Sequence, residues 1–166
     1  MPAREIVRYP SPILKQRCAE VEHSDVAARV AADLLETMRA HPRCVGLAAP
    51  QIGEAVRIVV VDASEHPKAE GAAHGLLTLV NPRIVEAAGD EVGREGCLSI
   101  PDLTANVRRA TRVVVEASSV GGDGLVVESI GFEARVLQHE LDHLDGTLFL
   151  DRIASREDLF RRRSYG

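Results

Sequence analysis

The segment that most constrains this chain runs from about Phe132 to Asp145, where apolar and ionisable residues alternate at helical spacing. Ala134, Leu137, Leu141 and Leu144 recur at intervals of 3, 4 and 3 residues. This pattern predicts an amphipathic helix whose apolar face packs against a sheet. An acid in its first turn and a glycine just after its end suit the two termini of such a helix.

A second helix is predicted from Asp25 to about Arg39, with Ser24 or Asp25 as its N-cap. Runs rich in β-branched residues predict strands. These strands are Val56–Asp62, Leu76–Val80, Arg83–Glu86, Thr111–Glu116 and Leu125–Ser129. We therefore predict an α+β fold, with mixed or antiparallel sheets packed around the central H-E-x-x-H helix and an additional N-terminal helix.

Glycine and proline positions predict the connections. Gly121–Gly124 separates the last two strands and indicates a hairpin. Asn81-Pro82 is expected to break the preceding strand run, and Ala63–Gly75 is expected to be an exposed loop. Ser155–Arg163 has room for about two helical turns.

The 166 residues suit one domain, residues 1–166. Apolar residues make up 45% and charged residues 27%, as in soluble globular proteins. No stretch approaches the ~20 apolar residues of a membrane span. The first residues do not resemble a secretory signal, so we expect a cytoplasmic location and no membrane partner. A net charge of −5 offers no reason to expect DNA binding, and Arg108-Arg109 reads as solvated surface.

The helix from Phe132 carries the sequence His139-Glu140-Leu141-Asp142-His143. Residues four apart share one helix face, so His139 and His143 can reach a single ion. Glu140 then projects toward the open side of that ion, where water would lie. The simpler interpretation is a hydrated polar stripe, but the flanking core leucines argue against it.

A catalytic metal site requires a third protein ligand. Asp145 and Asp151 are conceivable downstream, whereas Cys97 lies upstream in the Gly/Ser/Pro-containing turn Glu95–Pro101. The chain has three cysteines, an odd number that favours a metal or catalytic role for one of them over a disulfide framework. An isolated cysteine is more often a small core residue.

A third segment, Gly46–Gly53, has the composition of a tight, closely packed loop. Packing explains its glycines and alanines but not Gln51. The side-chain amide of Gln51 has two donors that can serve an oxyanion.

Together these segments resemble the three signature motifs of peptide deformylases, G-x-G-x-A-A-x-Q, E-G-C-x-S and Q-H-E-x-D-H. The corresponding stretches are Cys44–Gln51, Glu95–Ser99 and Gln138–His143, and the likeness runs from Arg8 to about Ile153. Cys44 replaces the first glycine of the loop motif, where a side chain could narrow the substrate cleft or add an oxidisable thiol.

The resemblance implies that Cys97, His139 and His143 hold one divalent metal ion. The ligand types suggest zinc. The resemblance implies Fe²⁺ as the native ion, with Ni²⁺ or Co²⁺ as substitutes, and the thiolate beside Fe²⁺ predicts sensitivity to oxygen.

The implied reaction removes the formyl group from the formylmethionine of new polypeptides and releases formate. Glu140 would act as general base and then acid, while Gln51 and the backbone N–H of Leu98 would stabilise the oxyanion. Arg109 would pair with Glu95 and brace the metal site. The substrate would contact residues around the motifs: Val45, Gly46, Glu95, Gly96 and Val136.

Other classes of protein remain open at this point. An H-E-x-x-H endopeptidase would cleave internal bonds and would not need Cys97. A deformylase-like binding module would lack catalysis, and a structural zinc site would need a fourth protein ligand such as Cys44 or Cys18. The expected partners are formylmethionyl nascent peptides, and Arg161–Arg163 could contact ribosomal RNA near the exit region.

Overall fold

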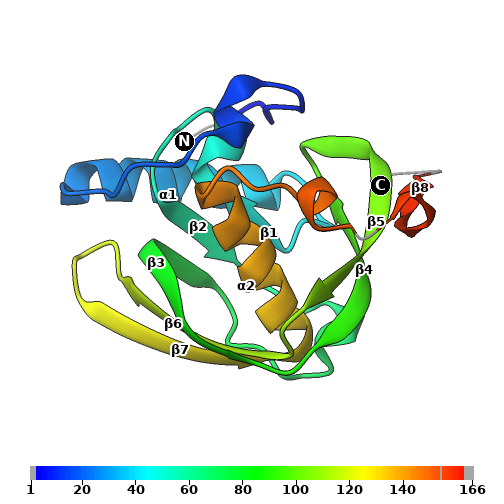
Figure 1. Cartoon of the computed structure of the whole chain (residues 1–166). Coiled ribbons are helices and arrows are strands. Elements are labelled where there is room, and N and C mark those ends of the chain that lie inside the picture. Colours follow the sequence, from blue (N-terminus) through cyan, green and yellow to red (C-terminus); the bar gives the residue numbers. More distant parts are fainter. Residues whose placement is uncertain (1–2, 154, 163–166) are drawn as a thin grey trace.

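The computed structural model describes residues 3–153 and 155–162, and Figure 1 shows its helices set among curved sheets. In this part of the chain the helical elements are α1 (Ser24–Arg39), α2 (Gly131–Leu144) and the 3-10 turns η1 (Pro12–Lys15), η2 (Ala49–Ile52), η3 (Pro67–Ala69), η4 (Phe149–Arg152) and η5 (Arg156–Asp158). The strands are β1 (Gly46–Ala48), β2 (Ile58–Val61), β3 (Leu77–Ala88), β4 (Glu91–Cys97), β5 (Ile100–Arg109), β6 (Arg112–Ser118), β7 (Gly124–Ile130) and β8 (Leu159–Arg161).

The strands form two sheets, one with the order β1-β2-β3-β6-β7 and one with the order β4-β5-β8. Every pair of neighbouring strands in these sheets is antiparallel. Two helices with antiparallel sheets confirm the predicted α+β class. The predicted hairpin at Gly121–Gly124 is also present, joining β6 to β7.

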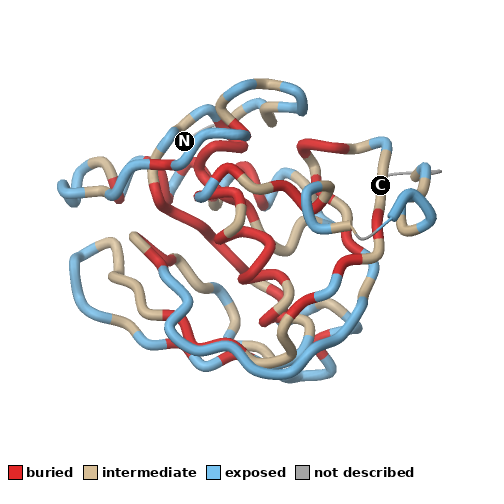
Figure 2. Tube along the Cα trace, in the orientation of Figure 1, coloured by how far each residue is buried: buried red, intermediate tan, exposed pale blue. Residues whose placement is uncertain are grey.

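Strand β2 is buried on both faces because a helix packs on each side. Val59 and Val61 belong to the core that contains α2, whereas Ile58 and Val60 belong to the core that contains α1. Alternate side chains of a strand point to opposite faces, so the continuous Ile-Val-Val-Val run serves both cores. Figure 2 shows the buried positions concentrated along β2 and α2.

The leucines predicted to face the core from α2 do so, since Leu137 and Leu144 are fully buried and Leu141 is 6% exposed. The helix ends at Leu144, and Gly146, two residues later, has a φ of 75° and lies against the backbone of Lys15. A β-carbon at this glycine would be 2.6 Å from the Lys15 carbonyl oxygen, so the residue permits close approach as well as the turn.

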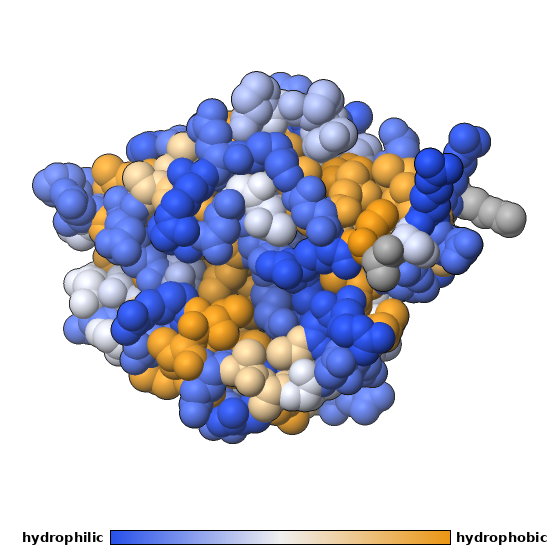
Figure 3. Space-filling model, in the orientation of Figure 1, coloured by the Kyte–Doolittle hydropathy of each residue, from blue (hydrophilic) through white to orange (hydrophobic). Residues whose placement is uncertain are grey.

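A smaller core joins the three-stranded sheet to η1 and η4. Phe149, Leu14 and Val107 are buried there beside Cys97. In Figure 3 apolar side chains gather over the lower part of the large sheet and near β5, with hydrophilic side chains between them. In the described residues no helix is long and apolar enough to cross a membrane.

The predicted break at Asn81-Pro82 is wrong, because β3 continues through it. Asn81 adopts a φ of 51° and the register with β6 shifts between Val80 and Arg83. The Asn81 side chain bonds both the N–H and the carbonyl oxygen of Val21, at 2.8 and 2.9 Å. The bulge therefore absorbs the irregular residues without ending the strand.

Three further local predictions need correction. Arg109, expected with Arg108 to be solvated surface, is only 5% exposed. Neither Ser24 nor Asp25 is the N-cap of α1, since His23 occupies that position without a side-chain capping bond. The segment expected as two helical turns, Ser155–Arg163, forms η5 and β8 instead, and its last residue, Arg163, lies outside the described ranges. Pairing with β5 outweighs the weak helical tendency of so short a segment.

Candidate metal centre and active-site cleft

Helix α2 positions the two histidines on its buried side. His139 and His143 are one turn apart, their ring centroids lie 5.1 Å apart, and the residues are 8% and 1% exposed. Burial and the nearby charge of His139 hold the pKa of His143 well below its usual value. His143 is therefore a neutral imidazole, the form that can donate a lone pair to a metal.

Cys97 is the last residue of β4, directly before the turn to β5, and it reaches the same point from the opposite sheet. Its Sγ lies 3.4 Å from His143 Nε2. The candidate ligand atoms of Cys97, His139 and His143 all lie within 4.8 Å of one another. These three residues form a possible site for one metal ion. The alternative ligands Asp145 and Asp151 instead form ion pairs with Arg57 and Lys15.

The polar atoms around this point fit a cation. His143 Nδ1 and Glu140 Oε1 are buried and have no hydrogen-bond partner in the described protein. His139 turns Nδ1 toward Glu95, at 2.9 Å, which leaves Nε2 for the side of Cys97. A carboxylate that orients a ligating histidine in this way is a usual feature of metal sites.

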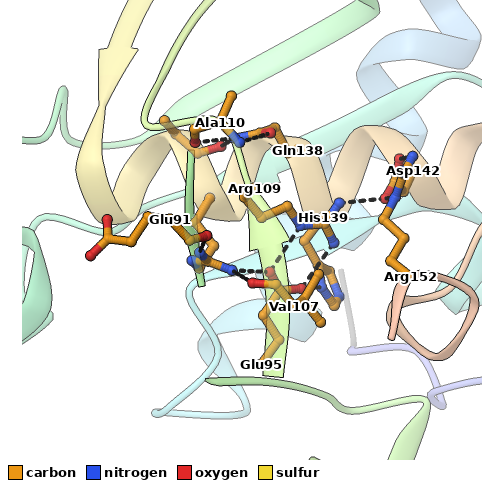
Figure 4. Close-up of polar contacts among 11 residues, drawn as sticks. Glu91, Glu95, Val107, Arg109, Ala110, Gln138, His139, Asp142 and Arg152 are labelled. Atoms are coloured by element: carbon orange, nitrogen blue, oxygen red, sulfur yellow. Dashed lines mark hydrogen bonds and ion pairs between the residues drawn. The ribbon is translucent and has the colours of Figure 1, made fainter. Parts of the chain in front are cut away.

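Glu95 is the centre of the polar network behind the site, drawn in Figure 4. Its carboxylate accepts two bonds of 2.9 Å from Arg109, one of 2.8 Å from Arg135 and one of 2.9 Å from His139. Burial opposes its ionisation, but the bonds from Arg109 and His139 outweigh burial and hold the pKa of Glu95 well below its usual range. The predicted pairing of Arg109 with Glu95 is therefore present.

Arg109 extends the network to α2. It donates from Nη1 to Asp142 at 2.6 Å, and Asp142 also accepts two bonds from Arg152. Burial disfavours the charged guanidinium, yet the bonds to Glu95 and the charge of Asp142 raise the pKa of Arg109 further. Strand β5 is thereby fastened to both β4 and α2.

Glu140 lies beside the possible metal site and is 4% exposed. Burial raises the pKa of Glu140 to about 7, despite the opposing effect of His139. This value suits a group that takes and returns a proton near neutral pH. A β-carbon on Gly46 would come within 2.8 Å of Glu140 Oε2, so only glycine leaves room for this carboxylate.

A cleft of about 330 Å³ opens over these residues. All the residues predicted to contact substrate line it, together with Leu98 and Glu140: Val45, Gly46, Glu95, Gly96 and Val136. Sequence reasoning missed several other lining residues: Arg43, His66, Lys68, Arg94, Phe132, Arg135 and Arg162. Arg135 precedes His139 by one helical turn, a spacing that could have revealed it.

Gln51 and Arg109 do not line this cleft. Gln51 is 2% exposed and lies behind Cys97, donating from Nε2 to Cys97 Sγ at 3.3 Å and to Ser99 Oγ at 3.1 Å. Its Oε1 accepts from the backbone of Ala48 at 3.0 Å. Ser99 was missed by sequence reasoning although it is the final residue of the E-G-C-x-S motif.

Cys44, the residue that departs from the loop motif, also lines the cleft. Its thiol donates to the Gly46 carbonyl oxygen at 3.0 Å. Burial, with a contribution from Glu140, raises the pKa of Cys44 to about 12. The residue is therefore a neutral thiol at physiological pH and not a second thiolate ligand.

An α+β fold with a Cys/His/His group beside a buried glutamate defines a candidate metallohydrolase. The model of the family described as Polypeptide deformylase matches residues 3–158. A peptide deformylase of Dictyoglomus thermophilum is 44% identical over 150 residues, covering 90% of this chain and 92% of that protein. Another, from Thermomicrobium roseum, is 46% identical over 160 residues, covering 96% of this chain and 90% of that protein.

Comparison with solved structures points to the same family. The peptide deformylase of Thermotoga maritima superimposes with a TM-score of 0.83 at 34% identity, covering 93% of this chain and 100% of that one. The peptide deformylase of Thermus thermophilus gives a TM-score of 0.81 at 41% identity, covering 91% of this chain and 86% of that one. The chain belongs to the polypeptide deformylase family. This is a family of metal-dependent hydrolases whose known function is deformylation of N-formylmethionyl peptides.

Proposed function

We propose that this chain, as a single catalytic domain, deformylates formylmethionyl peptides with one divalent ion held by Cys97, His139 and His143. The observation that carries the proposal is the meeting of these three ligands beside buried Glu140 at the floor of a cleft. The central helix α2 would supply two ligands and the base, so it would be the metal-binding helix of the fold. An ion bound there would supply Lewis acidity, polarising the formyl carbonyl and lowering the pKa of a water molecule.

Glu140 would take the proton from the attacking water and deliver it to the leaving amine nitrogen. Its buried Oε1 has no protein partner and is therefore free to accept a hydrogen bond from water. Its pKa of about 7 allows both proton transfers at neutral pH. The products would be formate and a free α-amine.

The negative charge that develops on the formyl oxygen would be stabilised by two donors beside Cys97. Leu98 lines the cleft, so its backbone N–H is one candidate. Gln51 is the other, since its amide already points toward Cys97 Sγ. Donors fixed before the reaction avoid reorganisation as charge develops.

The methionine side chain and peptide backbone would occupy the cleft walls. Val45 and Val136 supply apolar surface, Gly46 and Gly96 form part of the lining, and Glu95 holds the wall in place. Arg109 would act from behind, by fixing Glu95 and through it the ring of His139.

We propose Fe²⁺ as the native ion, with Zn²⁺, Ni²⁺ and Co²⁺ as competent alternatives. One soft thiolate and two imidazoles suit any of these cations. We also propose a cytoplasmic location, where newly made formylated chains occur. Arg161 and Arg162 near the described C-terminal end could contact ribosomal RNA, and Arg163 of the same cluster lies outside the described residues.

The test is formate release from a formyl-methionyl tripeptide by protein prepared without oxygen and loaded separately with Fe²⁺, Ni²⁺ or Zn²⁺. We expect turnover that depends on metal and is lost in Glu140→Ala, which should still bind one ion per chain. Full metal content and activity in Cys97→Ala would assign the third ligand elsewhere. Cleavage of internal peptide bonds would favour an endopeptidase, and metal-loaded protein without turnover would indicate a binding module.

A further inference from the structure

Cationic side chains from four separate segments line the cleft, and we call this set the basic rim: Arg43, Lys68, Arg94 and Arg162. Three of them, Arg43, Lys68 and Arg94, are exposed. Arg43 precedes β1, Lys68 lies in η3 and Arg94 lies on β4, so the positive charge lies on more than one wall of the cleft.

The carboxylates among the described lining residues do not offset the charge of Arg43, Lys68 and Arg94. They are Glu95 and Glu140, which are only 7% and 4% exposed and lie at the floor. Glu95 is already bonded to Arg109, Arg135 and His139. The exposed part of the cleft is therefore positive, although the whole chain has a net charge of −5.

The side chain of Arg94 is held in place by neutral partners. Its guanidinium lies 3.7 Å from the ring centroid of Phe160, in a cation–π contact. It donates to Asn106 Oδ1 at 3.1 Å and to Thr104 Oγ1 at 3.3 Å. These partners restrict the side chain but are neutral. Its charge stays available to a ligand, and less conformational entropy is lost on binding.

We infer that the basic rim selects substrates with Asp or Glu within the first few residues after formylmethionine. This inference rests on the proposed function, because it places the peptide in the same cleft. The cleft also carries the apolar residues Val45, Phe132 and Val136, which suit a peptide better than a bare phosphate chain. Opposite charge at a cleft raises the rate of encounter as well as the affinity.

The test compares kcat/KM of the metal-loaded enzyme for formyl-Met-Ala-Asp-Glu, formyl-Met-Ala-Ser-Ser and formyl-Met-Ala-Lys-Lys. At low salt we expect the acidic peptide to exceed the neutral one by about 3- to 10-fold, the effect of two exposed ion pairs. The lysine peptide should fall below the neutral one. Because exposed charges are screened, the differences should largely vanish near 0.5 M salt, where the Debye length is only about 4–5 Å.

Two variants test whether the rim is responsible. Arg94→Gln removes the charge and keeps hydrogen-bonding capacity, so the acidic-to-neutral ratio should fall by about 2- to 3-fold. Arg83→Gln is the matched control, since Arg83 is exposed on β3, pairs with Glu116 and does not line the cleft. It changes the net charge equally and should leave the ratio unchanged.

The outcomes separate this inference from the proposed function. Equal kcat/KM for all three peptides would refute charge selection while upholding deformylation. Binding of the unformylated product peptides, followed by fluorescence anisotropy, measures the same preference without turnover, so an inactive protein still tests the rim. An unstructured RNA oligonucleotide that occupies the cleft, with no discrimination between peptides, would reassign the rim to phosphate binding and overturn the inference.

Discussion

Glu95 is the residue at which fold stability and the proposed metal centre meet, and Glu95→Gln tests both. The substitution keeps the shape of the side chain but removes its charge. Arg109, with a side chain only 3% exposed, would then face a neutral amide instead of a carboxylate. Two of the four donors that now bond Glu95 would also meet an N–H₂ group, since each carboxylate oxygen accepts two bonds and glutamine retains a single acceptor oxygen.

The loss of stability expected in Glu95→Gln follows from the burial of the Glu95–Arg109 pair. Removing one partner of a buried ion pair costs roughly 3–5 kcal/mol, because the other charge is left uncompensated. Asp142 still pairs with Arg109, so we expect the lower end, about 3 kcal/mol. At roughly 2–4 °C per kcal/mol for a domain of this size, the Tm should fall by about 6–12 °C. Loss of the bond to His139 Nδ1 should weaken metal binding by about 10- to 100-fold.

The Glu95–Arg109 pair also predicts that the free energy of unfolding depends on pH. The folded-state pKa of Glu95 is depressed, so its contribution is present above the unfolded pKa of about 4.3 and is lost as pH falls. The difference in unfolding free energy between wild type and Glu95→Gln should therefore be constant from pH 8 to about 5. It should shrink progressively below pH 4.

The assay is urea denaturation of the metal-free protein across this pH range, followed by metal titration of both proteins at pH 7. Glu91→Gln is the matched control, because Glu91 is an exposed residue on the same strand. A loss of less than 1 kcal/mol in Glu95→Gln, together with unchanged metal affinity, would refute the view that this carboxylate organises the site.

Three shorter predictions concern the candidate active site. In urea denaturation, Glu140→Gln should stabilise the metal-free protein by about 2–3 kcal/mol more at pH 8 than at pH 4.5. The reason is that burial raises the pKa of Glu140 to about 7, so its ionisation opposes folding as pH rises. A difference in stability that does not change with pH would contradict this. Gln51→Ala should lower kcat by about 10²–10³, the usual effect of losing one oxyanion donor, whereas an unchanged kcat would make Gln51 a packing residue. Gly46→Ala should reduce deformylation at least about tenfold in steady-state assays while the protein stays folded, since its methyl group would lie 2.8 Å from Glu140 Oε2 and 2.9 Å from Val136; wild-type kinetics would show that the neighbours yield.

The sequence predicted the features that depend on local pattern. The periodic leucines of α2, the β-branched run of β2 and the Gly-rich turn between β6 and β7 are all where they were expected. Prediction failed where a tertiary contact decides the local structure. Asn81 reads as a strand breaker until its bonds to the Val21 backbone are known. The C-terminal β8 exists because β5 offers an edge, which no local pattern reveals.

The same distinction applies to the cleft. His139 and His143 were predictable from helical spacing, and Cys97 from its motif. The basic rim was not predictable, because Arg43, Lys68 and Arg94 are far apart in sequence and only the fold brings them together. Spacing can predict residues that share one helix, whereas residues that share a cleft require the topology.

The network behind the metal centre also explains why a buried, charged cluster is tolerated next to the core. Each ion would be costly alone, yet Glu95, Arg109 and Asp142 alternate in sign, and Arg135 and Arg152 complete the series. The members come from β4, β5, α2 and η4, so they fix the position of Cys97 relative to the helix that carries His139 and His143. An apolar core could hold these elements together equally well, but it could not orient the His139 ring through its Nδ1. The charge cluster is therefore best understood as the device that sets the geometry of the proposed ligands, with stability as its consequence.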